Sequence, residues 1–238
     1  MAVVTPTLLA ACGSTSDESA QVVADSTTAT QAPEASGGES VAEPVRWARA
    51  NLGFVSAYVL ARGNTAAIVD TGVSGSAAAI GEALGGLGLN YSDVDHVVLT
   101  HKHGDHAGSI AAVVAEAVNA TVYAGEADLS DIDQADIVGI SGGEDVFGCE
   151  MLSTPGHTAG HMCVIDHSTG LLVAGDAIFG DGSAVVEGSP NFFEDIPQSR
   201  ESIKMLAELS YNTVLFGHGE PIETGADAAV AALAASLG

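Results

Sequence analysis

Short apolar runs that end near glycine or polar residues alternate along the chain with longer helix-like runs. Eight of the short runs, rich in valine, isoleucine and leucine, predict buried β-strands. These strands are expected at 55–60, 66–69, 97–99, 121–124, 150–153, 162–166, 171–174 and 214–216. Helices are expected at 76–87, 109–118, 198–209 and 227–237. The alternation of strands and helices indicates an α/β fold.

Composition separates a folded part of the chain from an N-terminal part. The segment 13–45 is rich in Ser, Thr, Ala, Gln, Gly, Pro and acidic residues and has no aromatic residue, so it cannot build a core. The chain has 238 residues, of which 47% are hydrophobic, and this is enough for one sizeable core. We therefore expect a disordered linker at 13–45 and one folded domain at 46–238.

Residues 1–12 contain a different kind of motif. The sequence from Leu8 to Ser14, centred on Cys12, resembles a lipoprotein cleavage box in which the cysteine is lipidated. No Lys or Arg precedes it, and Pro6 interrupts an apolar run that is shorter than a normal signal. The resemblance implies an extracytoplasmic protein that touches the membrane only through a lipid on Cys12. The alternative is a free thiol on a soluble cytoplasmic protein.

The charge of the chain limits its partners. Lys and Arg number 6 against 31 Asp and Glu, which gives a formal net charge of −25. An extended polyanion such as DNA or RNA would be repelled, so we expect a small-molecule substrate and no nucleic-acid partner. The acidic residues are spread along the chain, as in a salt-adapted surface or in an ordinary acidic secreted protein.

The candidate chemistry begins directly after the apolar run 97–99. His101, His103, Asp105 and His106 fall within six residues, and imidazole and carboxylate groups are the ligands that ions such as Zn²⁺ prefer. The first two histidines share one face of an extended segment, whereas the last two residues follow the Gly104 bend. This arrangement predicts two ions, because one ion can hardly take all four groups.

Three more candidate ligands follow a common pattern. His157, Asp176 and His218 each come after a short apolar run and a glycine. The ordered pattern of ligands resembles the metallo-β-lactamase superfamily from about Trp47 to Glu223. Asp70, in the sequence Ile68-Val69-Asp70-Thr71-Gly72, also matches the first motif of that family.

The resemblance implies a four-layer αββα sandwich and assigns roles to these residues. It implies that the first ion is bound by His101, His103 and His157 and the second by Asp105, His106 and His218, with Asp176 bridging both. Asp105 and Asp176 would be the catalytic carboxylates. Asp70, and also His161, would support the ligands from behind, although His161 is equally placed to line the pocket. We assign the remaining His96 and His167 to solvated strand edges.

The expected function is a dinuclear zinc hydrolase that uses a metal-bound hydroxide on a small ester, lactone or lactam. The metals would be two Zn²⁺ ions, with Fe or Mn as alternatives. With a bridging aspartate, the expected site resembles that of the glyoxalase II and lactonase branches of the superfamily more than that of the true β-lactamases. Three other functions remain open: an iron-dependent oxidoreductase similar to persulfide dioxygenases, a thioesterase similar to glyoxalase II, and a non-catalytic metal-binding lipoprotein.

The segments 54–58 and 177–196 contain apolar residues and lie where, by the resemblance, this superfamily builds its substrate pocket. We expect it to be lined by Phe54, Tyr58, Phe179, Phe192 and Phe193, although each of these aromatic side chains is as readily explained by packing. Cys149 and Cys163 flank the His157 turn in two apolar runs. They form either a disulfide across paired strands or two unrelated core thiols.

Overall fold

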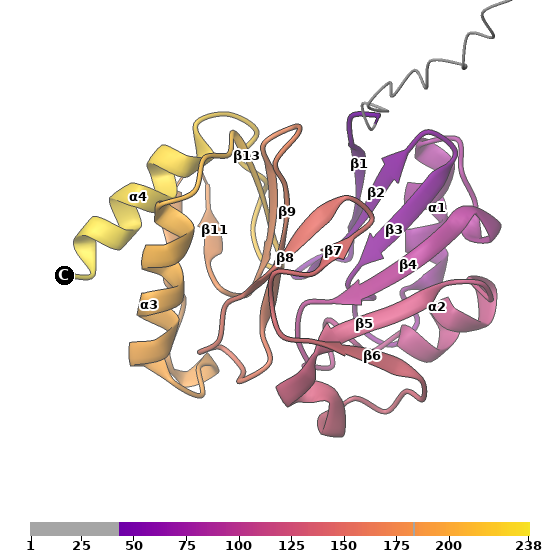
Figure 1. Cartoon of the computed structure of the whole chain (residues 1–238), viewed down its shortest axis with the longest axis horizontal. Helices are drawn as coiled ribbons and strands as arrows, with labels where there is room; N and C mark the ends of the chain where they lie inside the picture. Colours follow the sequence, from indigo (N-terminus) through magenta and orange to yellow (C-terminus); the bar gives the residue numbers. More distant parts are fainter. Residues whose placement is uncertain (1–42, 183) are drawn as a thin grey trace, which may run out of the picture. The chain divides into compact units, whose positions relative to one another are not determined.

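The computed structural model describes residues 43–182 and 184–238, so the expected box at Cys12 and most of the segment 13–45 lie outside the described residues. The described domain has four layers (Figure 1). Helices α3 (Ile196–Ala207) and α4 (Ala226–Ser236) cover one side of a pair of sheets, and α1 (Ala77–Gly86) and α2 (Ile110–Glu116) cover the other. The predicted αββα sandwich is confirmed.

The first sheet has six strands in sequence order. They are β1 (Arg46–Asn51), β2 (Ser56–Arg62), β3 (Thr65–Val69), β4 (Val94–Leu99), β5 (Thr121–Gly125) and β6 (Ile137–Ile140). The first three strands pair antiparallel, and β3 to β6 pair parallel. Parallel pairing places the carboxyl ends of β3, β4 and β5 at the same edge of the sheet. α/β proteins bind their ligands at this edge.

The second sheet has the order β13-β10-β9-β8-β7. Its strands are β7 (Asp145–Val146), β8 (Cys149–Ser153), β9 (Met162–Asp166), β10 (Leu171–Gly175) and β13 (Thr213–Phe216). Strand β13 pairs parallel with β10, and the other pairs are antiparallel. A separate hairpin consists of β11 (Phe179–Asp181) and β12 (Ala184–Val186), and short 3₁₀ helices lie at Tyr91–Asp93, Glu126–Asp131 and Pro190–Phe192.

All eight predicted strands and all four predicted helices are present, with ends that differ by a few residues. The strands that the sequence did not indicate are β1, β6, β7, β11 and β12. Three of them, β1, β6 and β7, lie at sheet edges, and the other two form the separate hairpin. An edge strand buries less apolar surface than a central strand, so its sequence carries a weaker hydrophobic pattern. No helix in the described part of the chain is long and apolar enough to cross a bilayer.

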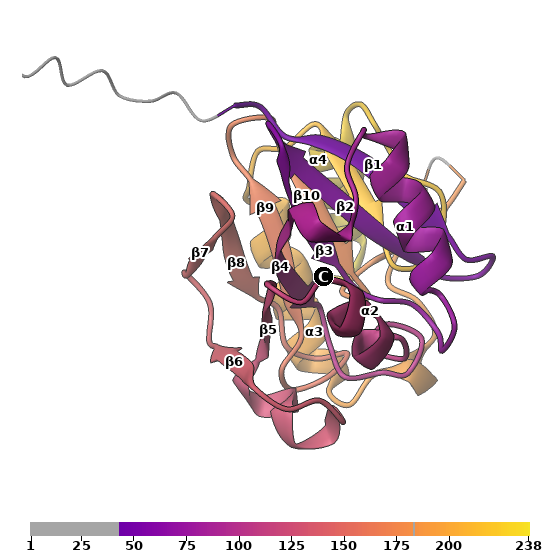
Figure 2. The same ribbon diagram turned by 90° about the vertical axis from the view of Figure 1, so that its right-hand side faces the viewer.

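Three apolar cores separate the four layers. Ile80 and Leu84 of α1 share the first core with Val97 of β4, where α1 and α2 lie over the first sheet (Figure 2). The second core lies between the sheets and contains Tyr58, Leu60, Val98, Met151 and Val173. The third core joins Ile203 and Leu206 of α3 to the other face of the second sheet. Each sheet is therefore buried on both faces, which fits its near-continuous apolar strands.

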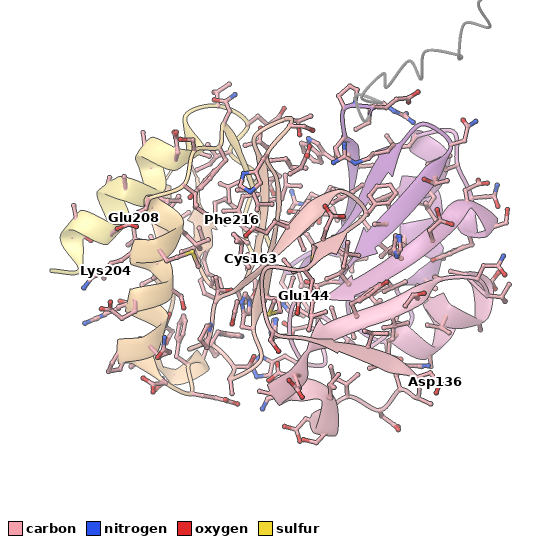
Figure 3. All side chains as sticks on the ribbon, in the orientation of Figure 1. Asp136, Glu144, Cys163, Lys204, Glu208 and Phe216 are labelled. Carbon is pink, nitrogen blue, oxygen red and sulfur yellow. The ribbon has the colours of Figure 1, made fainter. Side chains whose placement is uncertain are left out.

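The two cysteines of the folded domain lie on opposite faces of the second sheet. Cys149 belongs to the core between the sheets. Cys163 belongs to the core under α3, which also contains Phe216; both residues are labelled in Figure 3. Both thiols are buried and free. Cys163 is paired with Leu152 rather than with Cys149, and side chains on opposite faces of a sheet point apart and cannot form a disulfide. The structure therefore supports the alternative of two unrelated core thiols.

Hydrogen bonds join the two sheets at both of their ends. At one end, the Ser56 amide donates to the Gly217 carbonyl at 2.9 Å, and the Met162 amide donates to the Thr100 carbonyl at 2.8 Å. At the other end, Arg62 of β2 bonds to Asp166 of β9 at 2.8 Å. These contacts fix how the sheets are aligned, and with them the distance between loops that come from different sheets.

The Arg62–Asp166 pair is nearly inaccessible to solvent. The Arg62 side chain is 12% exposed and the Asp166 side chain 1%. The guanidinium also donates to the carbonyl oxygens of Phe147 and Gly148. Burial acts to raise the pKa of Asp166, but hydrogen bonds from Thr169, Ser168 and Arg62 hold it below its ordinary value. The carboxylate is thus ionised and depends on these donors.

Replacing Arg62 by methionine is expected to destabilise the domain by about 3 kcal/mol, because the buried carboxylate then lacks its counter-charge. Urea unfolding monitored by circular dichroism measures the change in the free energy of unfolding. Lys204 lies on the outer side of α3 (Figure 3) and pairs with Glu201 in solvent. Lys204→Met should change stability by less than about 0.5 kcal/mol. Equal effects of the two substitutions would contradict the role of the buried pair.

Candidate metal centre

The ends of four strands meet at one edge of the sandwich and carry all the predicted ligands. His101, His103, Asp105 and His106 follow β4 of the first sheet. His157 follows β8, Asp176 follows β10 and His218 follows β13 of the second sheet. The structure therefore brings all seven residues together, and both sheets contribute to the same centre.

Three imidazole nitrogens form the first group. His101 Nε2 lies 3.0 Å from His103 Nδ1 and 3.2 Å from His157 Nε2, and the last two atoms are 2.9 Å apart. Nitrogens that share one tetrahedral zinc ion at about 2.0–2.1 Å lie roughly 3.4 Å from one another. The triangle is therefore close to the size that a metal ion requires.

Two of these imidazoles, those of His101 and His157, are kept neutral, as metal ligands must be. Burial lowers the pKa of His101 well below its ordinary value, and the nearby His106 adds to the effect. Burial likewise lowers the pKa of His157 to about 4, although Asp176 opposes the shift. Both rings can present a free lone pair at neutral pH.

Asp105, His106 and His218 form the second group. His218 Nε2 lies 3.3 Å from Asp105 Oδ2, and His106 Nε2 lies 4.0 Å from the same oxygen. Burial acts to lower the pKa of His218, but Asp105 and Asp176 raise it to about 10. The carboxylates thus attract a positive charge to this position, which is the electrostatic condition for a cation site.

Asp176 contacts both groups. Its Oδ2 lies 3.4 Å from His157 Nε2 and 3.3 Å from His218 Nε2, while its Oδ1 lies 3.2 Å from His106 Nε2. His106 Nε2 and Asp176 Oδ1 are buried and have no hydrogen-bond partner among the described residues. Buried polar atoms without partners are costly unless an ion satisfies them. The donor set therefore fits two metal ions that share Asp176.

Asp70 holds the second group from below. Its carboxylate accepts hydrogen bonds from the Thr100 amide at 2.7 Å and from the Thr100 hydroxyl, and it lies 2.7 Å from His106 Nδ1. This contact leaves Nε2 of His106 to point into the centre. Asp70 is therefore in a position to orient the ring of His106, as expected.

His161 is fully buried behind the first group and does not line the pocket. Its Nδ1 lies 2.8 Å from the Thr154 hydroxyl, and its Nε2 accepts the Asp176 amide hydrogen at 3.0 Å. Burial lowers the pKa of His161 to about 3, so the ring is a neutral acceptor. It thereby fixes the backbone of the residue that bridges the two groups.

The sequence did not single out Asp128, which is fully buried in the short helix after β5. Its carboxylate accepts hydrogen bonds from the Lys102 amide at 3.1 Å, the Thr158 hydroxyl at 2.6 Å and the Gly160 amide at 2.9 Å. Lys102 lies between two ligands of the first group, and Thr158 follows the third. Asp128 thus ties the two ligand loops to each other, which no local motif could have indicated.

Glycines allow these loops to approach so closely. A Cβ atom at Gly125 would collide with the Gly160 carbonyl, and one at Gly217 would collide with Asp176 Oδ1 and with the ring of His106. The glycine before His218 is therefore required for steric reasons.

A cavity of about 540 Å³ opens above the centre. Its lining consists of Phe54, His103, Asp105, His157, Asp176, Phe179, Phe192 and His218. Phe193 contacts the rings of His157 and Phe179 from the side. The cavity has the size of a small-molecule site, and its floor holds ligands of both groups.

The structure corrects the expectation for Tyr58. The ring is 1% exposed, lies in the core between the sheets and donates its hydroxyl hydrogen to the Phe216 carbonyl at 2.8 Å. Burial raises the pKa of this hydroxyl to about 12. Strand alternation directs Tyr58 into the sandwich, away from the cavity.

His96 is a second correction. It lies on the central strand β4, where its ring packs against Tyr123 and Phe147, so it is not at a solvated strand edge. His167, in contrast, is exposed and lies 2.8 Å from Glu150. The prediction for His96 was wrong because it could not take account of neighbouring strands.

Several curated proteins are similar to this chain. The uncharacterized protein YobT of Bacillus subtilis is 28% identical over 197 residues, which cover 70% of this chain and 83% of YobT. Hydroxyacylglutathione hydrolase of Aeromonas hydrophila is 30% identical and covers 67% of this chain and 58% of its own length. Thioesterase pkgB of Emericella nidulans is 28% identical, with 69% and 46% covered. Apart from YobT, the chain spans about half the length of these relatives.

Solved structures share the fold. The metallo-beta-lactamase family protein TTHA1429 from Thermus thermophilus superimposes with a TM-score of 0.63 at 22% identity, covering 81% of this chain and 77% of that protein. The protein TTHA1623, solved in a di-iron-bound form, gives a TM-score of 0.60 at 24% identity and covers 73% and 92%. At this level of identity the likeness concerns the fold alone.

The sequence model of the metallo-beta-lactamase superfamily matches residues 50–218. The matched range contains well over half of the chain and includes the whole cluster of ligands from His101 to His218. The chain belongs to the metallo-beta-lactamase superfamily.

Proposed function

We propose that this chain is a dinuclear metal-dependent hydrolase of small esters, lactones or lactams. The observation that carries the proposal is the position of Asp176, which contacts both ligand groups and also lines an open cavity of substrate size. Superfamily membership adds support, because two relatives are named as hydrolases of acyl compounds. They are hydroxyacylglutathione hydrolase and thioesterase pkgB.

The first ion would be held by His101, His103 and His157, and the second by Asp105, His106 and His218, with Asp176 shared. When bound, such ions supply Lewis acidity, which lowers the pKa of water and polarises a carbonyl. Nitrogen-rich ligands with a carboxylate suit zinc, and iron and manganese are the alternatives.

The side chains of the cavity floor would orient the reactants. Hydrogen bonding from His218 leads the effects that hold the pKa of Asp105 below its ordinary value, so this carboxylate stays an acceptor at neutral pH. Asp105 and Asp176 both reach the cavity, where their oxygens can accept hydrogen bonds from the attacking water. Asp70 and His161 keep His106 and Asp176 in place while the reaction proceeds.

Metal content distinguishes this proposal from an iron oxidoreductase. Protein purified without chelator should contain about two ions per chain, mostly zinc, by elemental analysis. His101→Ala and His218→Ala should each lose roughly one ion, because each removes a ligand of a different group. His167→Ala removes an exposed histidine outside the centre and should retain both ions. One iron per wild-type chain would contradict the hydrolase assignment.

Asp128→Asn should weaken metal binding by roughly 10- to 100-fold, because the ligand loops lose a shared carboxylate acceptor. Competition with a chromophoric chelator measures the affinity. Asp131→Asn is the matched control, since Asp131 is on the same short helix but contacts the Lys102 ammonium, at 3.0 Å, rather than the ligand loop backbone. Equal affinities for the two variants would show that the Asp128 contacts do not position the ligands.

Activity provides the direct test. A panel of aliphatic lactones, acyl-homoserine lactones, β-lactams, S-lactoylglutathione and a bis-phosphodiester is assayed with zinc at low and molar salt. Neutral lactones should be hydrolysed faster than the anionic thioester and the anionic phosphodiester, because a chain of charge −25 disfavours anions. Asp176→Asn should reduce the rate by at least about 10²-fold. No turnover by the protein with two ions bound would favour a binding role instead.

A further inference from the structure

Four of the six phenylalanines of the chain gather around the metal centre. Phe54, Phe179 and Phe192 line the cavity, and Phe193 packs against His157 with ring centroids 5.3 Å apart. Phe54 and Phe179 both lie nearly parallel to the His218 ring, with centroids 6.0 and 5.7 Å from it. Aromatic residues make up only 5% of the chain, so this concentration is local.

Two of these rings are unusually exposed. Phe54 is 63% exposed and Phe192 is 62% exposed, and they are two of the four large hydrophobic residues that are exposed in the described part of the chain. The other two, Val118 and Val138, are not part of the cavity lining. Aromatic surface left in water at the mouth of a cavity is typical of a binding site for an apolar ligand.

The lysine and arginine side chains near this mouth are already paired with carboxylates. The lining residues described in the structure include no Lys or Arg. Lys102, on the ligand loop, lies 2.8 Å from Glu194 and 3.0 Å from Asp131. Arg49, near His218, lies 2.6 Å from Glu220 and donates to the Gly219 carbonyl. These cations are compensated by carboxylates, so a negatively charged end of a substrate would find no free lysine or arginine among the described residues there.

From these observations we infer the substrate class, an inference that rests on the proposed hydrolase function. The aromatic rim, defined as Phe54, Phe179, Phe192 and Phe193, binds an uncharged apolar acyl chain and presents its carbonyl to the metal centre. A chain that ends in a carboxylate is rejected, because the rim would desolvate the charge without pairing it. The reaction adds water across the acyl bond and releases an acid and an alcohol.

A matched pair of substrates tests the rim. p-Nitrophenyl octanoate and the mono-p-nitrophenyl ester of suberic acid have acyl chains of the same length but differ in the far end, which is a methyl group in one and a carboxylate in the other. Each buried methylene contributes about fourfold in binding. The neutral ester should therefore exceed p-nitrophenyl butanoate by roughly 10-fold or more in kcat/KM, and it should exceed the charged ester by at least as much.

Two lysine substitutions separate the rim from the overall charge. Phe192→Lys should lower kcat/KM for the octanoate and raise it for the charged ester, each by roughly fivefold or more, since it removes apolar surface and adds a cation at the mouth. Val118→Lys changes the net charge equally at an exposed position outside the lining and should leave the preference unchanged. The same shift in both variants would overturn the inference in favour of general electrostatics.

Binding gives a readout that does not depend on turnover. Octanamide and suberamate, the same amide with a carboxylate at its far end, are titrated against the wild type and both variants by ligand-observed NMR. The wild type should bind octanamide at least about 10-fold more tightly than suberamate, and Phe192→Lys should narrow the gap. If no ester is hydrolysed but this preference is found, the hydrolase proposal fails and the rim remains. If esters are hydrolysed and both amides bind equally, the rim inference fails.

Discussion

Contact of the Asp176 carboxylate with imidazoles from both sheets is the constraint on which the rest of the molecule depends. His106 comes from the first sheet, whereas His157 and His218 come from the second, and all three lie within 3.4 Å of its oxygens. The Asp176 oxygens can contact these three histidines only if the two sheets are held in a fixed position relative to each other. The bonds that join the sheets at Ser56 and Met162, close to the site, provide that alignment.

Concentrating imidazoles and carboxylates in a buried place is unfavourable without cations, so the surrounding structure must hold them there. Buried acceptors do this from behind. Asp70 fixes His106, His161 fixes the backbone of Asp176, and Asp128 joins two ligand loops. Because the ligands belong to both sheets, bound ions would also link the sheets, and metal binding would contribute to the stability of the whole domain.

The surface charge and the mouth of the cavity would both influence which substrates the proposed hydrolase accepts. A net charge of −25 acts over the whole surface and weakens with salt, whereas the phenylalanine rim acts by contact and does not. Both would disfavour anionic substrates, but the first would act through long-range electrostatics and the second through desolvation at the contact. Under the proposed function, the substrate preference would depend on the cavity and on the long-range field together.

The sequence by itself determined the core of the fold and the candidate ligands, because central strands and ligand-bearing turns are local patterns with the right residue types in the right order. Only the tertiary structure decided what depends on neighbours. Tyr58 lies in the core although its sequence position suggested the pocket, and His96 is covered by rings from other segments. Asp128 supports the ligand loops from a short helix, 26 residues along the chain from Lys102. Such roles follow from which strands lie side by side, and a linear pattern does not carry that information.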